Sequence, residues 1–311
     1  MNLDKVTIYS FYRFKYLNNL KSIKKELDKS LIAKKIFGTV LIANEGINGT
    51  ISGNQNELNV FILKIKKVLK IRSLPLKISK SKFHPFYRMK IRIKKEIVTM
   101  GNNKIKPEKK TGEYILPKDW DKTIKNKKNL IIDTRNEYEI NIGTFENAEN
   151  PKLKSFRNFP NFIKTRNLKK DQSIVMFCTG GIRCEKASSY LIDQGYKNVY
   201  QLYGGILNYL EFKKNKKKSS WIGECFVFDN RVALNSKLKI GTYDQCFGCR
   251  HPITKKDKGL KSYKKGISCK YCVNKRTEKQ KKSSLTRQLQ IVKADMNNQP
   301  HNFKKIYLDK K

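Results

Sequence analysis

Short apolar runs alternate with helically spaced segments over the first third of the chain. Residues 6–11 (VTIYSF) and 37–43 (FGTVLIA) are rich in β-branched and aromatic side chains, which predicts two strands. Residues 23–31 and 57–69 carry apolar side chains at helical intervals, which predicts two helices. The glycines of residues 44–53 (NEGINGTISG) fit a tight hairpin between the second strand and the second helix.

The order of these elements defines a first domain. A strand–helix–strand–strand–helix–strand succession is typical of a ferredoxin-like or acylphosphatase-like layer of sheet and helices, which we expect over residues 1–115. Residues 89–101 (MKIRIKKEIVTMG) predict a further hairpin, and residues 101–112 (GNNKIKPEKKTG) have the composition of a linker.

A second domain begins where the pattern changes. The runs LIIDT, SIVMFC and NVYQLY are short apolar strands separated by helical segments, which is the signature of a parallel sheet with crossover helices. We place this domain at residues 116–215, so the overall fold class is α/β. A charged hinge (KKNKKKSS) leads into a Cys-rich C-terminal module at residues 216–275. Residues 276–311 form a Lys-rich basic tail, either a frayed helix or a disordered arm.

The charge of the chain is strongly positive. It has 69 Lys and Arg against 26 Asp and Glu among 311 residues, a formal net charge of +43. Only 12 of the basic residues are Arg, and Ile and Asn are abundant, so an AT-rich coding sequence accounts for part of the excess. A field this positive still attracts polyphosphate, and we expect contact with a nucleic acid.

Membrane and export signals are missing from the sequence. No apolar run approaches the roughly 20 residues that cross a bilayer, and the first residues lack the pattern of a signal peptide. We therefore expect no membrane partner and a cytoplasmic location. Seven cysteines, an odd number, then favour thiol chemistry or metal ligation over a disulfide framework.

The segment SIVMFCTGGIRCEKASSYL carries the sharpest chemical signal. An apolar strand runs into Cys178, followed by Gly180, Gly181 and Arg183, and a helix is predicted to begin near Cys184. Glycines let backbone N–H groups turn inward, and the helix N-terminus adds positive charge, so this loop suits a thiolate or persulfide. Arg183 can bind an anionic group there. The alternative is a buried structural cysteine that ends a core strand.

Four other cysteines have the spacing of a metal site. Cys246 and Cys249 form one CxxC pair, Cys269 and Cys272 form another, and 19 residues separate the pairs. Two such turns complete a tetrahedral shell of thiolates, which predicts a structural Zn2+. Paired reduced thiols and a redox pair are the alternatives.

The remaining candidate residues have mainly structural interpretations. We expect Cys225 and His84 in the core and His251 as a turn-capping residue. Cys184 either packs in the first turn of its helix or acts as a resolving thiol for Cys178. Residues 87–92 (YRMKIR) alternate as in a strand, and one face of it either meets RNA or is solvated.

Residues 120–212 resemble a rhodanese domain. The stretch LIIDTRNEYEINIGTFENAENP resembles the first motif of that family, CTGGIR its Cys-x4-Arg active loop, and GYKNVYQLYGGI its closing strand. The resemblance implies that Cys178 is the persulfide-forming cysteine and that Asp133 and Arg135 brace the sheet and loop. It also implies a loop cradle formed by Thr179, Gly180, Gly181, Ile182 and Arg183. Gly143 and Thr144 replace the Gly-His of many rhodaneses, which argues against a generic thiosulfate sulfurtransferase.

Motifs in all three regions, in the same order, extend the resemblance to residues 1–275. LIANEGINGTISG and KKEIVTMG, the rhodanese loop, and WIGECFVFDNRVAL with CFGCRHP and GISCKYC are similar to those of bacterial rhodanese-domain tRNA uridine hydroxylases. The resemblance implies tRNA as the partner, molecular oxygen as co-substrate, and oxygen-dependent conversion of the wobble uridine to 5-hydroxyuridine with Cys178 as the catalytic residue.

The residues themselves leave the electron donor open. No G-x-G-x-x-G fingerprint follows a strand, and the three histidines, His84, His251 and His301, lie in separate regions. Two other functions stay open on the sequence: a persulfide sulfurtransferase acting in tRNA thiolation or sulfur transfer, and a noncatalytic RNA-binding module. The oligomeric state is equally open.

Overall fold

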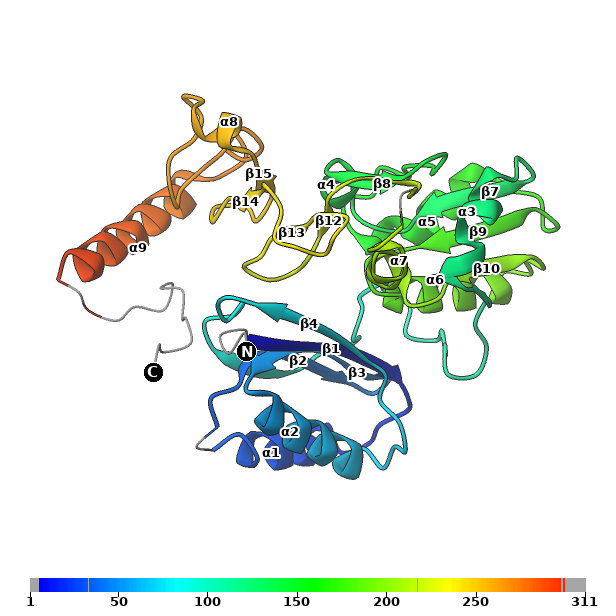
Figure 1. The fold of residues 1–311 in the computed structure, drawn as a ribbon, viewed down its shortest axis with the longest axis horizontal. Coiled ribbons are helices and arrows are strands. Elements are labelled where there is room, and N and C mark those ends of the chain that lie inside the picture. The colour runs from blue at the N-terminus through cyan, green and yellow to red at the C-terminus, as the bar shows by residue number, and fades with distance from the viewer. Residues whose placement is uncertain (1–5, 33, 217, 298, 300–311) are drawn as a thin grey trace.

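The computed structural model describes residues 6–32, 34–216, 218–297 and 299 (Figure 1). An N-terminal sheet backed by two helices, a central α/β domain and a C-terminal region of short strands follow one another along the chain (Figure 1). Mixed α/β architecture, predicted from the alternation of short strands and helices, is confirmed.

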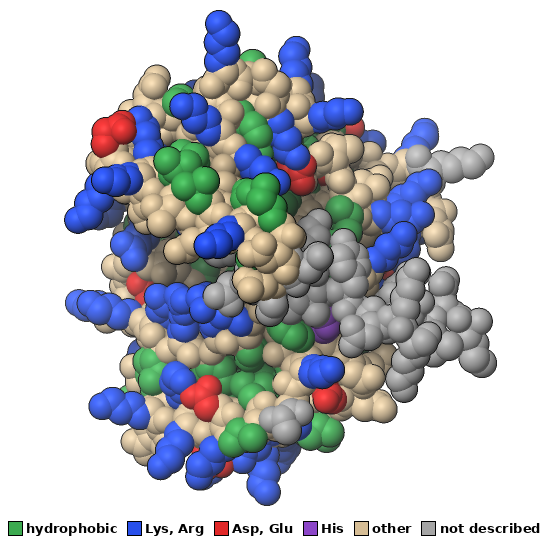
Figure 2. All heavy atoms as spheres, turned by 90° about the vertical axis from the view of Figure 1, so that its left-hand side faces the viewer, with side chains coloured by type: hydrophobic (Ala, Val, Ile, Leu, Met, Phe, Trp, Pro, Cys, Tyr) green, Lys and Arg blue, Asp and Glu red, His purple; other side chains and the backbone are tan. Residues whose placement is uncertain are grey.

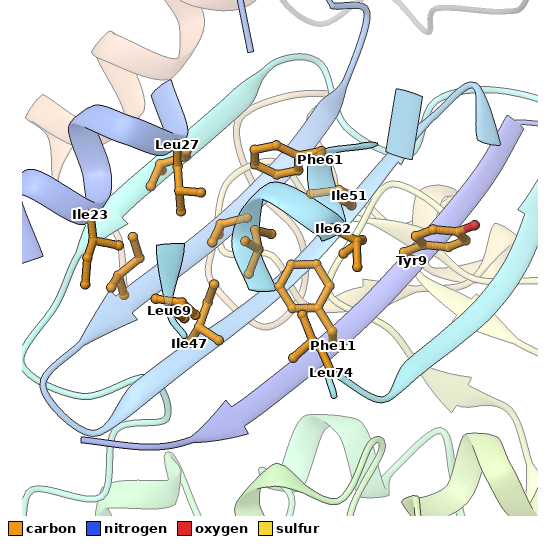
Figure 3. Close-up of a cluster of buried hydrophobic side chains, with 14 of the residues drawn as sticks. Tyr9, Phe11, Ile23, Leu27, Ile47, Ile51, Phe61, Ile62, Leu69 and Leu74 are labelled. Atoms are coloured by element: carbon orange, nitrogen blue, oxygen red, sulfur yellow. The ribbon is translucent and has the colours of Figure 1, made fainter. Parts of the chain in front are cut away.

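The N-terminal domain is a five-stranded sheet with the order β4-β1-β3-β2-β5. Helices α1 and α2 cover one of its faces, and their apolar sides meet the sheet in a single core (Figures 1 and 3). The predicted succession of elements in an acylphosphatase-like domain is confirmed. Its elements are β1 (Val6–Phe14), α1 (Leu20–Lys29), β2 (Phe37–Ala43), β3 (Gly46–Gly53), α2 (Gln55–Val68), β4 (Leu76–Ser81) and β5 (Met89–Ile93).

The hairpin predicted for residues 89–101 is wrong. β5 is a single strand that pairs in parallel with β2 at the edge of the sheet. After it, the Glu96 carboxylate accepts the backbone N–H groups of Met100 (2.8 Å) and Gly101 (3.0 Å), so these amides do not enter a strand ladder. Ile97 is buried against the N-terminal domain. The segment therefore turns inward to join the two domains, a role that its local apolar pattern does not reveal.

The central domain is built on a parallel sheet with the order β6-β10-β9-β7, which confirms the predicted parallel sheet. Alternate side chains of β9 enter different cores: Met176 packs with α5 and α6, whereas Phe177 packs with α3 and α7. The sheet is thus covered on both faces. The elements are β6 (Glu113–Ile115), α3 (Pro117–Lys125), β7 (Asn129–Asp133), α4 (Glu137–Ile140), β8 (Gly143–Phe145), η1 (Phe156–Asn158), α5 (Phe159–Arg166), β9 (Ser173–Phe177), α6 (Ile182–Asp193), β10 (Val199–Leu202) and α7 (Gly205–Lys213).

The C-terminal region begins as an extension of the central domain. β11 (Trp221–Gly223) pairs with β8, and both Trp221 and Cys225 are buried in the core that α3 and α7 form. Two small hairpins and a short helix follow: β12 (Cys225–Phe226) with β13 (Ala233–Leu234), β14 (Asp244–Gln245) with β15 (Pro252–Ile253), and α8 (Lys255–Lys258).

The basic tail contains a long helix, α9 (Glu278–Met296). Thr277 and Gln280 form a capping box that satisfies the first backbone N–H groups of this helix. The helical interpretation of the tail is therefore right for residues 278–296, and the disordered alternative is wrong there. Residues 298 and 300–311 of the predicted tail lie outside the described residues. Among the helices that the structure describes, α9 included, none combines the length and apolarity that a bilayer crossing requires.

Candidate active site

Cys178 ends strand β9, and its loop leads directly into helix α6. The backbone N–H of Gly181, a residue with φ of 103°, points at the Cys178 sulfur over 3.1 Å. Helix α7 packs against the same loop through glycine: a Cβ on Gly205 would lie 2.4 Å from the Cys178 carbonyl oxygen. Thr179, Gly180, Ile182 and Arg183 complete the loop, so the structure brings together the candidate residues between 178 and 183.

The surroundings of Cys178 favour its thiolate. Complete burial by itself raises the pKa of this thiol, but four contacts outweigh it. These are a hydrogen bond from the Cys184 thiol, the charge of Arg183, and the backbone N–H groups of Cys184 and Gly181. Together they hold the pKa of Cys178 well below its ordinary value, which is typical of a reactive cysteine rather than a structural one.

Cys184 lies in helix α6 and is buried in the same core cluster as Cys178. It is fully buried in the core shared with α5 and α6, and its sulfur lies 3.5 Å from the Thr134 hydroxyl. Burial, followed by the nearby Cys178 sulfur, raises the pKa of Cys184 well above its usual range. Cys184 therefore remains a neutral donor to Cys178. This arrangement matches the packing interpretation.

Arg183 is less free than the loop motif implies. Its guanidinium donates to both carboxylate oxygens of Glu139, at 2.7 and 2.8 Å, and to the Thr179 hydroxyl at 3.3 Å. Glu139 is fully buried in helix α4. Because this carboxylate neutralises Arg183, the arginine orients the loop and supports the thiolate but has limited capacity for another anion. No motif in the sequence singles out Glu139 as the partner of Arg183.

Asp133 and Arg135 lie beside the Cys178 loop, and neither lines the cavity that opens in front of it. Both are fully buried and form a two-pronged ion pair, with Nη2 of Arg135 2.7 Å from Asp133 Oδ2. Arg135 also donates to the Gly143 carbonyl oxygen (2.6 Å), and the Thr144 hydroxyl donates to Asp133 (2.9 Å). This geometry fits a bracing role, and Thr144 contributes to it.

A cavity of about 920 Å³ opens in front of the Cys178 loop. Side chains of the N-terminal domain, the central domain and the C-terminal region all line it. The N-terminal domain supplies Lys77 from β4, whose ammonium donates to the carbonyl oxygens of Gly180 (2.5 Å) and Gly204. Burial lowers the pKa of Lys77 to about 8. The loop therefore receives a cation from a strand about one hundred residues away.

Glu185 forms the opposite polar group of the cavity. Its carboxylate accepts hydrogen bonds from the hydroxyls of Tyr12 (2.6 Å) and Tyr114 (2.9 Å). Burial raises the pKa of Glu185 above its ordinary value although both hydroxyls act in the other direction. Four residues that line this cavity were not predicted from the sequence: Lys77, Tyr12, Tyr114 and Glu185. Only the position of Glu185, directly after the CTGGIRC segment, was a local signal.

The four cysteines of the C-terminal region come together as their spacing predicts. The sulfur atoms of Cys246, Cys249, Cys269 and Cys272 all lie within 4.8 Å of one another. Three of the four residues are buried, and hairpin β14–β15 carries the first pair into position. This cluster can hold a metal ion. His251 does not join it: its ring stacks on Tyr271 with centroids 5.0 Å apart.

The expected core positions of Cys225 and His84 are confirmed. Cys225 is completely buried, which raises its pKa to about 12. His84 is buried, its ring lies 4.4 Å from that of Phe37, and its Nδ1 is 3.3 Å from the Ser52 hydroxyl. Burial lowers the pKa of His84 to about 4, so the imidazole is neutral. His301 lies outside the described residues.

Family comparisons agree with this architecture. Residues 6–97 match the family described as UPF0176 acylphosphatase like domain, and residues 116–212 match the family of rhodanese-like domains. The molecule is thus a rhodanese-domain protein with an acylphosphatase-like domain in front. The tRNA uridine(34) hydroxylase of Pelagibacter ubique (strain HTCC1062) is 49% identical over 301 residues, 96% of this chain and 99% of that protein. The chain belongs to the tRNA uridine(34) hydroxylase family.

Solved structures with rhodanese folds are also similar to parts of the chain. A rhodanese-related protein from Thermoplasma volcanium is 23% identical, covers 32% of this chain and 92% of its own, and has a TM-score of 0.27. A rhodanese-like domain protein from Staphylococcus aureus is 26% identical, covers 31% and 90%, and also has a TM-score of 0.27. Likenesses at this TM-score carry no weight beside the full-length relative.

Proposed function

We propose that this protein hydroxylates the wobble uridine of tRNA at C5, forming 5-hydroxyuridine with molecular oxygen as co-substrate. The observation that carries the proposal is Cys178, a low-pKa cysteine at the wall of a large cavity, in a chain related along its whole length to a tRNA uridine(34) hydroxylase. The protein then acts as an oxidoreductase in the cytoplasm, where its tRNA substrate is found.

The chemistry assigned to Cys178 follows from the electronic structure of uracil. The C5–C6 double bond is conjugated to the C4 carbonyl, so addition of a thiolate at C6 makes C5 electron-rich. C5 then receives one oxygen atom, and loss of the thiolate restores the double bond. The second oxygen atom leaves as water, with two electrons from an external donor.

Two side chains that line the cavity support this step. The Lys77 ammonium supplies positive charge near the thiolate and the charge that develops on the ring. Glu185, with its raised pKa, can exchange a proton with the substrate. The N-terminal domain supplies Lys77 itself and the Tyr12 hydroxyl that binds Glu185.

The charge distribution fits an RNA substrate. Lys and Arg side chains spread over the face shown in Figure 2, whereas Asp and Glu are sparse there. The formal charge of +43 supplies a sequence-independent attraction to the phosphate backbone. We infer that the basic N- and C-terminal regions bind the anticodon arm and deliver an extruded uridine to Cys178.

For the cysteine cluster we propose structural Zn2+. Cys246, Cys249, Cys269 and Cys272 supply four sulfur ligands and leave no open position, so the ion would stabilise the C-terminal region and take no part in the reaction. The mutual contacts between Cys246 and Cys249 lower the pKa of Cys246 to about 5, which favours a thiolate ligand.

A sulfurtransferase is the second candidate, because the N–H groups around Cys178 stabilise a persulfide as well as a thiolate. Mass spectrometry of tRNA nucleosides from cells grown under heavy O2, with and without the gene, separates the two. Labelled hydroxyuridine that disappears with the gene is the expected result. Loss of a thiolated nucleoside instead would replace the hydroxylase by a sulfur carrier.

The role of Cys178 is tested by Cys178→Ala. We expect this variant to lose hydroxylation and to bind tRNA with nearly unchanged affinity. Cys225→Ala, which removes a buried thiol outside the cavity, is the matched control and should retain activity. Hydroxylation by Cys178→Ala at the wild-type rate would show that this cysteine is not catalytic.

A further inference from the structure

A second cavity adjoins the first. It has a volume of about 460 Å³ and lies between the N-terminal domain and the C-terminal region. Thr39, Phe86, Phe228 and Asp229 line both cavities, so the two are neighbouring compartments that share a wall. A ligand seated at Cys178 would therefore have its next covalently attached unit near this second compartment.

The second cavity is rich in cations that lack acidic partners. Arg88, Lys90 and Arg250 line it, and among the described residues none of the three forms an ion pair. Among the described residues that line this cavity, Asp229 is the acidic one, and its Oδ2 accepts a hydrogen bond of 2.6 Å from Arg231. Cations gathered without carboxylates are suited to phosphate oxygens.

The wall between the cavities also offers aromatic surface. Phe228 is 62% exposed although it is a large apolar side chain, and its ring lies edge-on to Phe226 at 5.1 Å. The Arg183 guanidinium, from the Cys178 loop, lies over the Phe228 ring, with its central carbon 5.7 Å from the ring centroid. The Tyr138 ring packs edge-on against Phe226, with the ring centroids 5.2 Å apart. An exposed ring fixed in this way is a stacking platform for a nucleic-acid base.

We propose that the second cavity is a binding site for the nucleotide next to the target uridine. Arg88 and Arg250 bind the phosphodiester that joins the two nucleotides, and Phe228 stacks with the neighbouring base. The inference rests on the proposed function, because it takes an RNA uridine as the ligand of the first cavity. It adds a subsite that fixes the register of the strand, so that only a uridine with a seated neighbour reaches Cys178.

The test measures binding of short RNAs to the full chain carrying Cys178→Ala. The nucleoside uridine, which carries no phosphate, and the dinucleotides UpA and ApU are compared, followed by an anticodon stem-loop. We expect one dinucleotide to bind at least 10-fold more tightly than uridine. Arg88→Gln and Arg250→Gln should each remove most of this gain and leave the affinity for uridine unchanged. Arg72→Gln, an exposed arginine outside both cavities, is the matched control.

The salt dependence of stem-loop binding tests the phosphate contacts independently. Log affinity falls with log salt, and each lost phosphate contact makes this slope less steep by about 0.7 for a single strand. We expect this decrease for Arg88→Gln and Arg250→Gln and none for Arg72→Gln. Equal slopes in all three variants, or a dinucleotide gain that survives both substitutions, would overturn the subsite. Since binding is measured without oxygen chemistry, failure of the hydroxylase proposal is detected separately by the heavy-oxygen experiment.

Discussion

Lys186 joins the central domain to the N-terminal domain through a buried ionic cluster. Its ammonium, on helix α6, lies 2.5 Å from Glu45 Oε2 and 2.7 Å from Glu96 Oε2, and it also donates to the Val98 carbonyl oxygen at 3.1 Å. The Lys186 side chain is completely buried, and Glu45 and Glu96 are 12% and 7% exposed. Lys186→Met therefore leaves two carboxylates without their cation.

The expected loss of stability is large. Removing one partner of a buried ion pair costs about 3–5 kcal/mol, because the remaining charge is neither solvated nor paired. With two carboxylates affected, we expect Lys186→Met to lower the free energy of unfolding by about 4–5 kcal/mol. At about 2–4 °C per kcal/mol, this corresponds to a Tm lower by about 8–20 °C.

Tryptophan fluorescence during urea unfolding is a suitable assay. The chain has two Trp residues, Trp120 and Trp221, and both are buried in the core of the central domain. Arg166→Met is the control in the same domain: its ion pair with Glu149 is half exposed, so its loss should cost at most about 1 kcal/mol. If both variants shifted the transition equally, the buried cluster would not contribute as argued.

Acid should reduce the difference between Lys186→Met and the wild type. In the wild type, burial raises the pKa of Glu96, but Lys186 and two backbone N–H groups lower it below its ordinary value. The pairing therefore stabilises the fold above the unfolded-state pKa, and this contribution is lost as pH falls through the folded-state pKa. A variant with Lys186→Met, Glu45→Gln and Glu96→Gln, which removes the unpaired charges, should regain much of the lost stability at neutral pH.

Three further outcomes test the site. Cys184→Ala removes a hydrogen bond to the Cys178 sulfur, so the pH midpoint for alkylation of Cys178 by iodoacetamide should rise; an unchanged midpoint would contradict the geometry. Lys77→Met should lower kcat about 10²-fold, the usual scale for a preorganised electrostatic group, whereas Lys80→Met on the exposed side of the same strand should have no effect. Cys246→Ser should lose about one equivalent of Zn by elemental analysis, and a wild-type chain purified without Zn would refute the metal assignment.

Features that depend on residues near one another in the sequence could be predicted from local patterns. The order of strands and helices follows from apolar spacing, and the Cys178 loop lies within one continuous segment. The cysteine cluster was predictable for a similar reason, because two CxxC turns each present a pair of thiols regardless of what surrounds them. Each of these signals is complete within a short stretch of sequence.

Contacts between domains carry no such local signal. The bond from Tyr12 to Glu185 joins residues 173 positions apart, and that from Lys77 to Gly180 joins residues 103 apart. The hairpin predicted over residues 89–101 failed for the same reason: Glu96 binds the distant Lys186, and this contact determines the path of the segment more than its strand-like composition does.

The division of roles around Cys178 explains why the site needs more than the rhodanese loop. Within the loop, Arg183 is already paired with Glu139, so its charge is largely compensated. The N-terminal domain adds Lys77, a cation whose bonds are to uncharged carbonyl oxygens and whose charge is therefore available to the cavity. The C-terminal region adds Phe228 and Asp229 to the wall that separates the two cavities. Because each domain supplies a different kind of group, the site around the reactive thiol is complete only where all three regions meet. Under the proposed function, a uridine extruded from an RNA loop enters this site while the nucleotide next to it occupies the second cavity.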